Sequence, residues 1–121
     1  MAKPRARPPE DISPEEFFTR WVPESVGADV QRRGRLRDTR ASIVFEITGP
    51  ERSVFTVQIA AGEVRGVAGC ASEPDLRVEV DHETWRALNR GDLSAPEALL
   101  RRRLRIHGNF VLALKLQLIL G

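Results

Sequence analysis

The sequence predicts an α+β fold, in which a five-stranded and mostly antiparallel sheet is covered on one face by helices. Two observations predict it. Five short segments alternate apolar and polar residues, as strands with one buried and one wet face do. Most of these strands come first and most helical segments come later, so we expect the helices to gather on one face of the sheet.

A single domain is expected to account for nearly all of the chain. The protein has 121 residues, of which 41% are hydrophobic and 30% charged, and this composition is typical of one soluble globular domain. Residues 1–12 begin with a basic, proline-rich stretch, which we expect to be a disordered tail. No apolar core follows its charges, so the tail does not resemble an export signal. We place the domain at residues 13–121.

The strands are recognised by apolar residues at every second position and by turn residues between them. Residues 49–52 begin with Gly-Pro, and residues 61–63 contain a glycine, as turns commonly do. We expect strands over residues 42–48, 54–59, 64–69, 76–80 and 104–107.

Capping residues mark where the helices begin. Residues 13–16 form a capping box, with serine at the N-cap, proline at N1 and glutamate at N3. Pro23 is expected to limit this helix, because proline lacks an N–H and clashes with the preceding turn. Asp81 caps a second helix that ends near Gly91, and residues 94–97 form another capping box.

The C-terminal helix is the most informative segment. Asn109 is a good N-cap, and only Lys115 and Gln117 are polar in the helix expected over residues 110–120. These two side chains project on different sides, so the helix has no continuous polar face and must be buried on most sides. At roughly 16 Å it is too short to cross a membrane core of about 30 Å. Other protein segments, a bound apolar ligand, a partner chain or a membrane surface are the alternatives for covering it.

The order of these segments resembles the sterol carrier protein 2-like (SCP2-like) lipid-binding domains. The resemblance extends from about Ser13 to Leu120 and rests on order and spacing, because each motif alone is ordinary strand, cap or turn chemistry. The sequence departs from the family pattern at residues 101–103, where three arginines replace an apolar residue and a glycine. The matching stretches are residues 43–49, 55–59, 66–69, 74–76, 85–88, 91–94 and 104–109.

The resemblance implies an apolar cavity between the sheet and the helices. It implies non-enzymatic binding, with or without carriage, of a lipid such as a fatty acid, an acyl ester or a sterol-like molecule. Apolar walls and one or two polar groups suffice for such a site. On this basis we expect the lipid cavity to be lined by Phe45, Val57, Ile59, Val78 and Ile106 of the strands and by Trp85, Val111, Leu114 and Leu118 of the helices.

Catalysis and metal binding have little support. The chain has two histidines, His82 and His107, and one cysteine, Cys70. A zinc site needs three or four ligands at short spacings, and a nucleophilic thiol needs a base, neither of which the sequence provides. Cys70 is expected to be a small buried or half-buried thiol. We expect no catalytic residue, no metal and no cofactor.

Two arginine clusters raise the question of nucleic-acid binding. No aromatic residues interleave with them, and the net charge of the chain is only +2, so we expect solvated surface charge and no nucleic-acid partner. Weak contact with an anionic membrane surface is a milder alternative. The clusters comprise Arg32, Arg33, Arg35, Arg37 and Arg40, then Arg101, Arg102, Arg103 and Arg105.

An interaction module is the other alternative that the sequence leaves open. The apolar helix over residues 110–120 could pack on its copy in a homodimer or on a larger enzyme, because a partner also covers excess apolar surface. The single cysteine excludes an internal disulfide framework and is compatible with a cytoplasmic protein.

Overall fold

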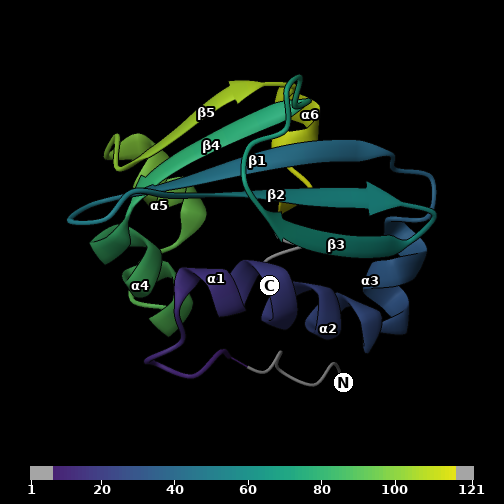
Figure 1. Cartoon of the computed structure of the whole chain (residues 1–121), viewed down its shortest axis with the longest axis horizontal. Helices are drawn as coiled ribbons and strands as arrows, with labels where there is room; N and C mark the ends of the chain where they lie inside the picture. The colour runs from purple at the N-terminus through teal and green to yellow at the C-terminus, as the bar shows by residue number, and fades with distance from the viewer. Residues whose placement is uncertain (1–6, 117–121) are drawn as a thin grey trace.

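The computed structural model describes residues 7–116, in which five strands form one sheet in the order β3-β2-β1-β4-β5. Strand β1 pairs parallel with β4, and the other neighbouring strands pair antiparallel. The prediction of a mostly antiparallel sheet with helices on one face is therefore confirmed (Figure 1). The strands are β1 Ala41–Thr48, β2 Ser53–Ala60, β3 Glu63–Ala68, β4 Leu76–Asp81 and β5 Leu104–Gly108.

Helices precede the sheet, follow β4 and follow β5. The first three segments form one continuous helix whose middle is a π-helical turn. The helical segments are α1 Pro14–Glu16, η1 Phe17–Trp21, α2 Val22–Gly27, α3 Val30–Arg35, α4 His82–Arg90, α5 Ala95–Leu100 and α6 Phe110–Ala113.

The predicted N-caps are confirmed. The side chains of Ser13, Asp81, Ser94 and Asn109 each accept a hydrogen bond from the backbone N–H three residues later, at 3.0–3.2 Å. Gly91 ends α4 with a φ of 80°, which is the left-handed conformation that glycine adopts without strain.

The expectation that Pro23 limits the first helix was wrong. Helix α2 continues through Pro23, because the preceding turn widens into η1. The backbone N–H of Val22 donates to Phe17 O, five residues back, instead of to the residue four back. A proline normally clashes with the carbonyl four residues earlier, and we attribute its tolerance here to this wider turn.

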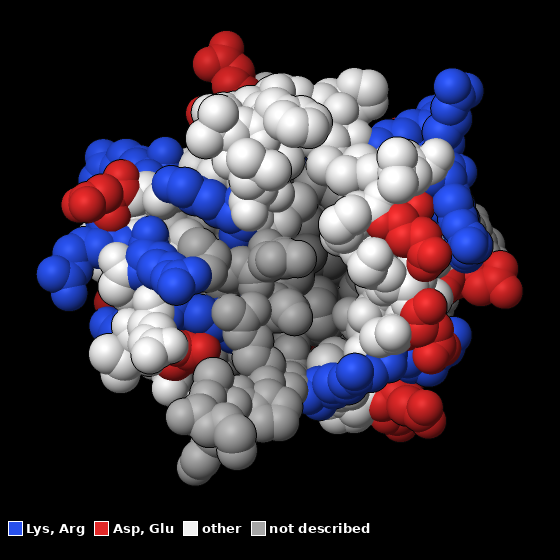
Figure 2. Space-filling view, turned by 180° about the vertical axis from the view of Figure 1, so that it is seen from behind, with Lys and Arg blue, Asp and Glu red and all other residues white. Residues whose placement is uncertain are grey.

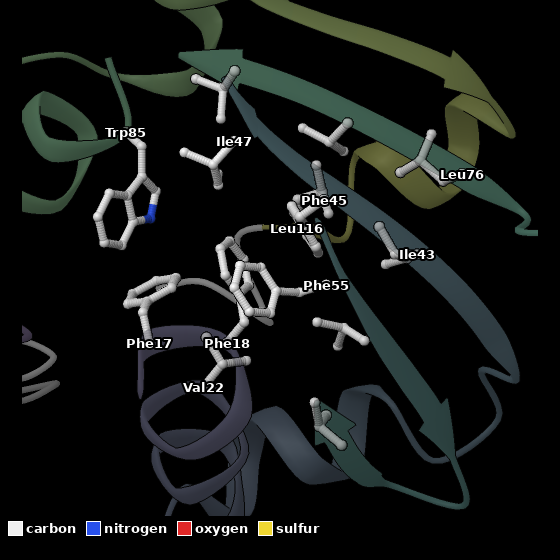
Figure 3. Close-up of a cluster of buried hydrophobic side chains, with 14 of the residues drawn as sticks. Phe17, Phe18, Val22, Ile43, Phe45, Ile47, Phe55, Leu76, Trp85 and Leu116 are labelled. Carbon is white, nitrogen blue, oxygen red and sulfur yellow. The ribbon is translucent and has the colours of Figure 1, made fainter. Parts of the chain in front are cut away.

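The core lies between the helices and the inner face of the sheet. Alternate residues of β1 and β2 supply this face, as the sequence predicts, and Phe18 stacks on Phe45 and Phe55 from the helix side, with ring centroids 4.8 and 5.3 Å apart (Figure 3). Gly66 of β3 allows the helix to approach, because a Cβ there would lie 1.8 Å from the backbone O of Phe18.

The segment between β3 and β4 covers part of the outer face. It passes in front of β2 and β1 in Figure 1 and delivers the chain to β4, beside β1. Thr56 fastens it, because its Oγ1 donates to Gly69 O at 2.8 Å and accepts from the N–H of Ala71 at 3.0 Å. Val44 lies on this outer side of β1 and is fully buried.

The packed structure begins slightly before the predicted boundary at residue 13. Ile12 is buried in the core, and Arg86 Nη1 of α4 donates to the backbone O of Glu10 at 2.5 Å. Residues 7–12 therefore lie against the domain. Of the disordered tail expected over residues 1–12, residues 1–6 lie outside the described residues. The single helix expected over residues 110–120 was wrong in its described part, because α6 ends at Ala113 and residues 114–115 form a turn, and residues 117–120 lie outside the described residues.

Candidate functional site

Most of the predicted cavity residues lie together on the inner side of the sheet. The strand residues come from β1, β2, β4 and β5, and Trp85 faces them from α4. All belong to or pack against one hydrophobic cluster, so the sheet register brings them together as expected. Buried members are Phe45, Val57, Ile59, Val78 and Trp85, and Ile106 is half-buried.

Two of the three cavity residues predicted from the C-terminal helix are exposed to solvent. Val111 is 66% exposed and Leu114 is 73% exposed, so neither is covered by the described part of the chain. Leu118 lies outside the described residues. The nine-residue cavity lining therefore stays a prediction.

Aromatic rings fill the interior around Phe45. Phe17 makes edge-to-face contacts with Phe18 and with Trp85, with ring centroids 4.9 and 5.4 Å apart. Together with the rings of Phe45 and Phe55, these side chains form a packed aromatic centre beneath β1 and β2 (Figure 3). The predicted cavity therefore does not occupy this centre.

Two buried polar groups of α4 have no hydrogen-bond partner among the described residues. They are the indole Nε1 of Trp85 and the amide Nδ2 of Asn89, both on α4 and both shielded from solvent. Most buried N–H groups in folded proteins have an acceptor. Asn89 could not be singled out from the sequence, because only the fold shows that its amide nitrogen is buried.

Helix α6 exposes an apolar face. Phe110 is 66% exposed and lies on the same side as Val111 and Leu114, whereas Leu112 and Leu116 are buried. The prediction that this helix is covered on most sides does not hold for its described part. In Figure 2, the top of the view is mostly uncharged, with acidic side chains at its upper edge, and basic side chains lie on both sides of the view.

A polar pocket of about 270 Å³ lies at the end of β4. This pocket could not be predicted from the sequence, because its walls come from segments that only the sheet register brings together. Arginines and carboxylates share the pocket, so opposite charges offset one another. Its lining residues are Thr48, Glu79, Val80, Asp81, Arg102, Arg103 and Arg105.

Asp81 is held in place beside this pocket by the first turn of α4. Burial raises the pKa of its carboxyl, but hydrogen bonds from the side chain and backbone of Thr84, assisted by the positive charge of Arg103, lower the pKa overall. Arg103 Nε donates to Thr84 Oγ1 at 3.0 Å. This arrangement links β5 to the start of α4, and a structural role accounts for it.

The arginine clusters are partly structural. Arg32 is buried, and its Nη1 donates to Ser25 Oγ at 2.9 Å, so the expectation of solvated charge is wrong at this position. Burial follows from Asp29, which caps α3 and lies 4.0 Å from the Arg32 guanidinium. The exposed Arg101 pairs with Glu97, one turn earlier, at 3.4 Å.

The two histidines and the cysteine have separate surroundings and do not form a catalytic group with one another. His82 packs edge-on against Trp85, His107 is exposed, and Cys70 is exposed rather than buried or half-buried as expected. Cys70 lies in the segment that crosses the outer face, and Arg77 Nη2 donates to its Sγ at 3.3 Å. Within residues 7–116, no three His, Cys, Asp or Glu side chains could hold a metal ion together.

Comparison with known proteins decides the family. The family model of SCP-2 sterol transfer proteins matches residues 23–121. The chain belongs to the SCP-2 sterol transfer family. No curated protein matches the sequence. Within the described part of the chain, no helix combines the length and the apolar character needed to cross a membrane.

Solved structures share the fold of this SCP-2 family member. Palmitated SCP2L2 from Aedes aegypti has 23% sequence identity and a TM-score of 0.70, over 88% of this chain and 93% of that chain. Sterol carrier protein 2 from Yarrowia lipolytica, in its apo form, has 16% identity and a TM-score of 0.66, over 82% and 83%.

A third similar structure belongs to a larger enzyme. The sec-alkylsulfatase Pisa1 from Pseudomonas sp. has 13% identity and a TM-score of 0.67, over 91% of this chain but only 17% of its own. The SCP-2 family member thus corresponds to a small part of that enzyme, and the shared part shows a common fold.

Proposed function

We propose that this chain binds a lipid without catalysing a reaction on it. The ligand class is a fatty acid, an acyl ester or a sterol-like molecule. The observation that carries the proposal is the apolar surface of α6, where Phe110, Val111 and Leu114 lie next to one another and are exposed. Domains seldom expose contiguous apolar surface unless it contacts a ligand, a membrane or another protein. Membership of a family described by sterol transfer supports a lipid.

In the proposed site, the lipid chain lies between the inner face of the sheet and the C-terminal helix. The sheet side offers Val78 and Ile106. Val111 of α6 and its C-cap residue Leu114 are exposed in this structure and turn toward the ligand in the proposed bound state. Each Å² of apolar surface removed from water stabilises the complex by about 25 cal/mol, so an acyl chain binds without a charged partner. Binding of this kind requires no catalytic group.

A titration tests the proposal. Delipidated protein is mixed with a fluorescent fatty acid, and we expect saturable binding with a dissociation constant in the micromolar range or below. An organic extract of the purified protein is analysed by mass spectrometry in parallel and should contain lipid. Absence of both a saturable signal and an extractable lipid contradicts the proposal.

We further propose that α6 contacts an anionic membrane, from which the lipid is collected. Lys115 follows the apolar face of α6, and its Nζ donates to Thr39 Oγ1 at 2.8 Å. Arg40 is the next residue along the chain from Thr39 and is exposed, as is Arg37. Basic groups beside an apolar helix face suit anionic headgroups above hydrocarbon.

Vesicle sedimentation tests this contact with a matched pair of variants. Leu114→Asp places a charge on the α6 face, and Val30→Asp does the same at a comparably exposed position on α3. We expect the wild type and Val30→Asp to bind vesicles that contain phosphatidylserine, and Leu114→Asp to bind much less. Binding that is equal for both variants contradicts the contact. A dimer in native mass spectrometry that Leu114→Asp dissociates identifies a second copy as the occupant instead.

An accessory role in a larger enzyme is the alternative function. It is favoured by the sulfatase, of which this chain spans only 17%.

A cytoplasmic location is part of the main proposal, because the exposed thiol of Cys70 remains reduced in that compartment.

Nucleic acid has no place in the proposal. Arg102, Arg103 and Arg105 share their pocket with Glu79 and Asp81, and these carboxylates repel phosphate. A gel shift with random oligonucleotides at about 0.15 M salt should show no binding, whereas salt-steep binding identifies phosphate contacts.

A further inference from the structure

Helix α4 carries two buried hydrogen-bond donors for which the described residues 7–116 supply no acceptor. The indole Nε1 of Trp85 and the amide Nδ2 of Asn89 are both shielded from solvent and unpaired. A buried N–H group loses its hydrogen bond to water, and without an acceptor nothing replaces that bond. Two such groups on one short helix indicate that an acceptor is present in another state of the protein.

The two donors lie on the same side of α4. They are four residues apart, which places them one turn apart on one face of a helix. Trp85 is only 4% exposed, and its ring is held edge-on by Phe17 and by His82, each with a centroid 5.4 Å away. Figure 3 shows the indole nitrogen turned toward the middle of the apolar cluster. Packing therefore fixes the direction of this donor, which points inward.

Both donors are neutral, and the nearest cation on α4 is occupied elsewhere. The guanidinium of Arg86 lies over the Trp85 ring, 4.8 Å from its centroid, and its Nη1 donates to the backbone O of Glu10 at 2.5 Å. A carboxylate placed among Trp85, Phe17 and Asn89 would be an unpaired charge in an apolar interior, which is costly. A neutral carbonyl oxygen has no such cost.

We propose that Trp85 and Asn89 bind the carbonyl oxygen of a neutral fatty acyl ester. This inference rests on the proposed lipid-binding function and adds which lipid is preferred and which end of it meets α4. A carbonyl oxygen carries two lone pairs and accepts two N–H bonds at once. The acyl chain then extends from α4 along the apolar inner face of the sheet.

Competition among three ligands of matched chain length tests the proposal. Methyl palmitate, palmitate and hexadecane displace a fluorescent acyl probe from delipidated protein at neutral pH. We expect the ester to bind about tenfold more tightly than the hydrocarbon, a difference that one net hydrogen bond supplies. The ester should also bind more tightly than the ionised acid. Tighter binding of palmitate than of its ester identifies a carboxylate as the occupant and overturns the proposal.

Variants assign the preference to the donors. Trp85→Phe removes the indole N–H, and Asn89→Leu removes the side-chain amide with its two N–H groups and leaves an apolar side chain of similar size. Trp21→Phe is the matched control at a tryptophan that packs beside the core. We expect each donor variant to reduce the affinity for the ester several-fold and to leave that for hexadecane unchanged, while Trp21→Phe alters neither. If Trp85→Phe lowers the affinity for the ester and for the hydrocarbon equally, Trp85 contributes only apolar contact and donates no hydrogen bond to the ligand.

The failures of the two proposals are distinguishable. If all three ligands bind with equal affinity, lipid binding stands and the role of α4 is wrong. If none binds to the wild type, both proposals are wrong.

A measurement on the wild type covers the case in which a donor variant does not fold. The chain has two tryptophans, so two indole N–H signals are expected in a ¹⁵N NMR spectrum, and Trp21→Phe assigns them. The Trp85 signal should move to the position of a hydrogen-bonded indole when methyl palmitate binds and stay in place with hexadecane. An unmoved signal with bound ester overturns the proposal.

Discussion

Aromatic side chains are buried in the N-terminal helix and exposed in the C-terminal helix α6. In η1, Phe17 and Phe18 are buried, and their rings complete the aromatic centre. In α6, Phe110 is exposed, although this helix also contacts the sheet, at β4 and β5. Helix α6 is the more apolar of the two segments, so apolar composition does not determine which one is covered.

The difference lies in how closely each backbone approaches the sheet. Gly66 has no side chain, and the carbonyl of Phe18 occupies the space where a Cβ would be. This close approach lets both phenylalanines reach the inner face of the sheet. Helix α6 buries Leu112 and presents the opposite side to solvent. The N-terminal helix is therefore buried in the core, whereas α6 keeps exposed apolar surface, which the proposed function assigns to a ligand and a membrane.

The largest expected effect on stability comes from truncating Phe18 in the buried N-terminal helix. Phe18→Ala should lower the free energy of unfolding by about 3–5 kcal/mol, because it removes the ring that stacks on Phe45 and Phe55. Phe110→Ala is the control and should change it by about 0.5 kcal/mol or less, as surface substitutions do. Urea midpoints of both variants measure this. Similar losses at both positions contradict the contrast between the two helices.

A second comparison lies within the C-terminal segment itself. Leu116 is buried and Leu114 is exposed. Leu116→Ala should cost about 2–5 kcal/mol of stability, whereas Leu114→Ala should cost about 0.5 kcal/mol or less. Because Leu114 belongs to the proposed site, its truncation should lower lipid affinity more than stability. Urea unfolding and lipid titration on the same delipidated samples measure both. Unchanged lipid affinity in Leu114→Ala removes this residue from the site.

Val44 tests whether the outer side of the sheet takes part in binding. It is fully buried on the face that the β3–β4 segment crosses, away from Phe45. Val44→Ala deletes two methyl groups and should cost about 2 kcal/mol. Lipid affinity should stay as in the wild type, since the proposed chain lies on the other face. A clear loss of affinity in this variant places the ligand elsewhere.

The smallest effect concerns Asp81, which anchors the helix bearing Trp85. Its pKa is lower than the ordinary 3.8 in the folded state, so its carboxylate stabilises the protein at neutral pH. This contribution is lost as the pH falls below 3.8 and through the folded-state pKa. Asp81→Asn keeps an N-cap but cannot titrate, so the difference in urea midpoint between wild type and variant should shrink in acid. A constant difference excludes this role.

Local signals in the sequence predicted much of the fold. Strand faces such as Ile43, Phe45 and Ile47 follow from a period of two, and caps such as Asn109 follow from hydrogen bonds to neighbouring residues. The π-helical turn before Pro23 could not be predicted, because the widened turn is set by packing against β3. The parallel pairing of β1 with β4 likewise joins segments that have no local relation.

The site was predicted less completely, for a related reason. Trp85 was selected from its place in the family resemblance, but that its N–H is unpaired depends on Phe17 and His82 around the ring. Exposure of Val111 and Leu114 depends on how α6 meets β4 and β5, which the apolar pattern alone does not reveal.

The position of β4 beside β1 has a consequence for how the chain folds. Strands β1, β2 and β3 pair with their neighbours in sequence, whereas Ile43 of β1 pairs with Leu76 of β4. Pairings between distant segments require closure of a long loop and form slowly. During synthesis, the first helix and strands β1–β3 are made before β4. Core residues of the later elements, such as Leu76, Trp85 and Leu112, are made after them. The apolar core of this domain is therefore completed only when α6, which carries the proposed lipid-binding surface, has joined it.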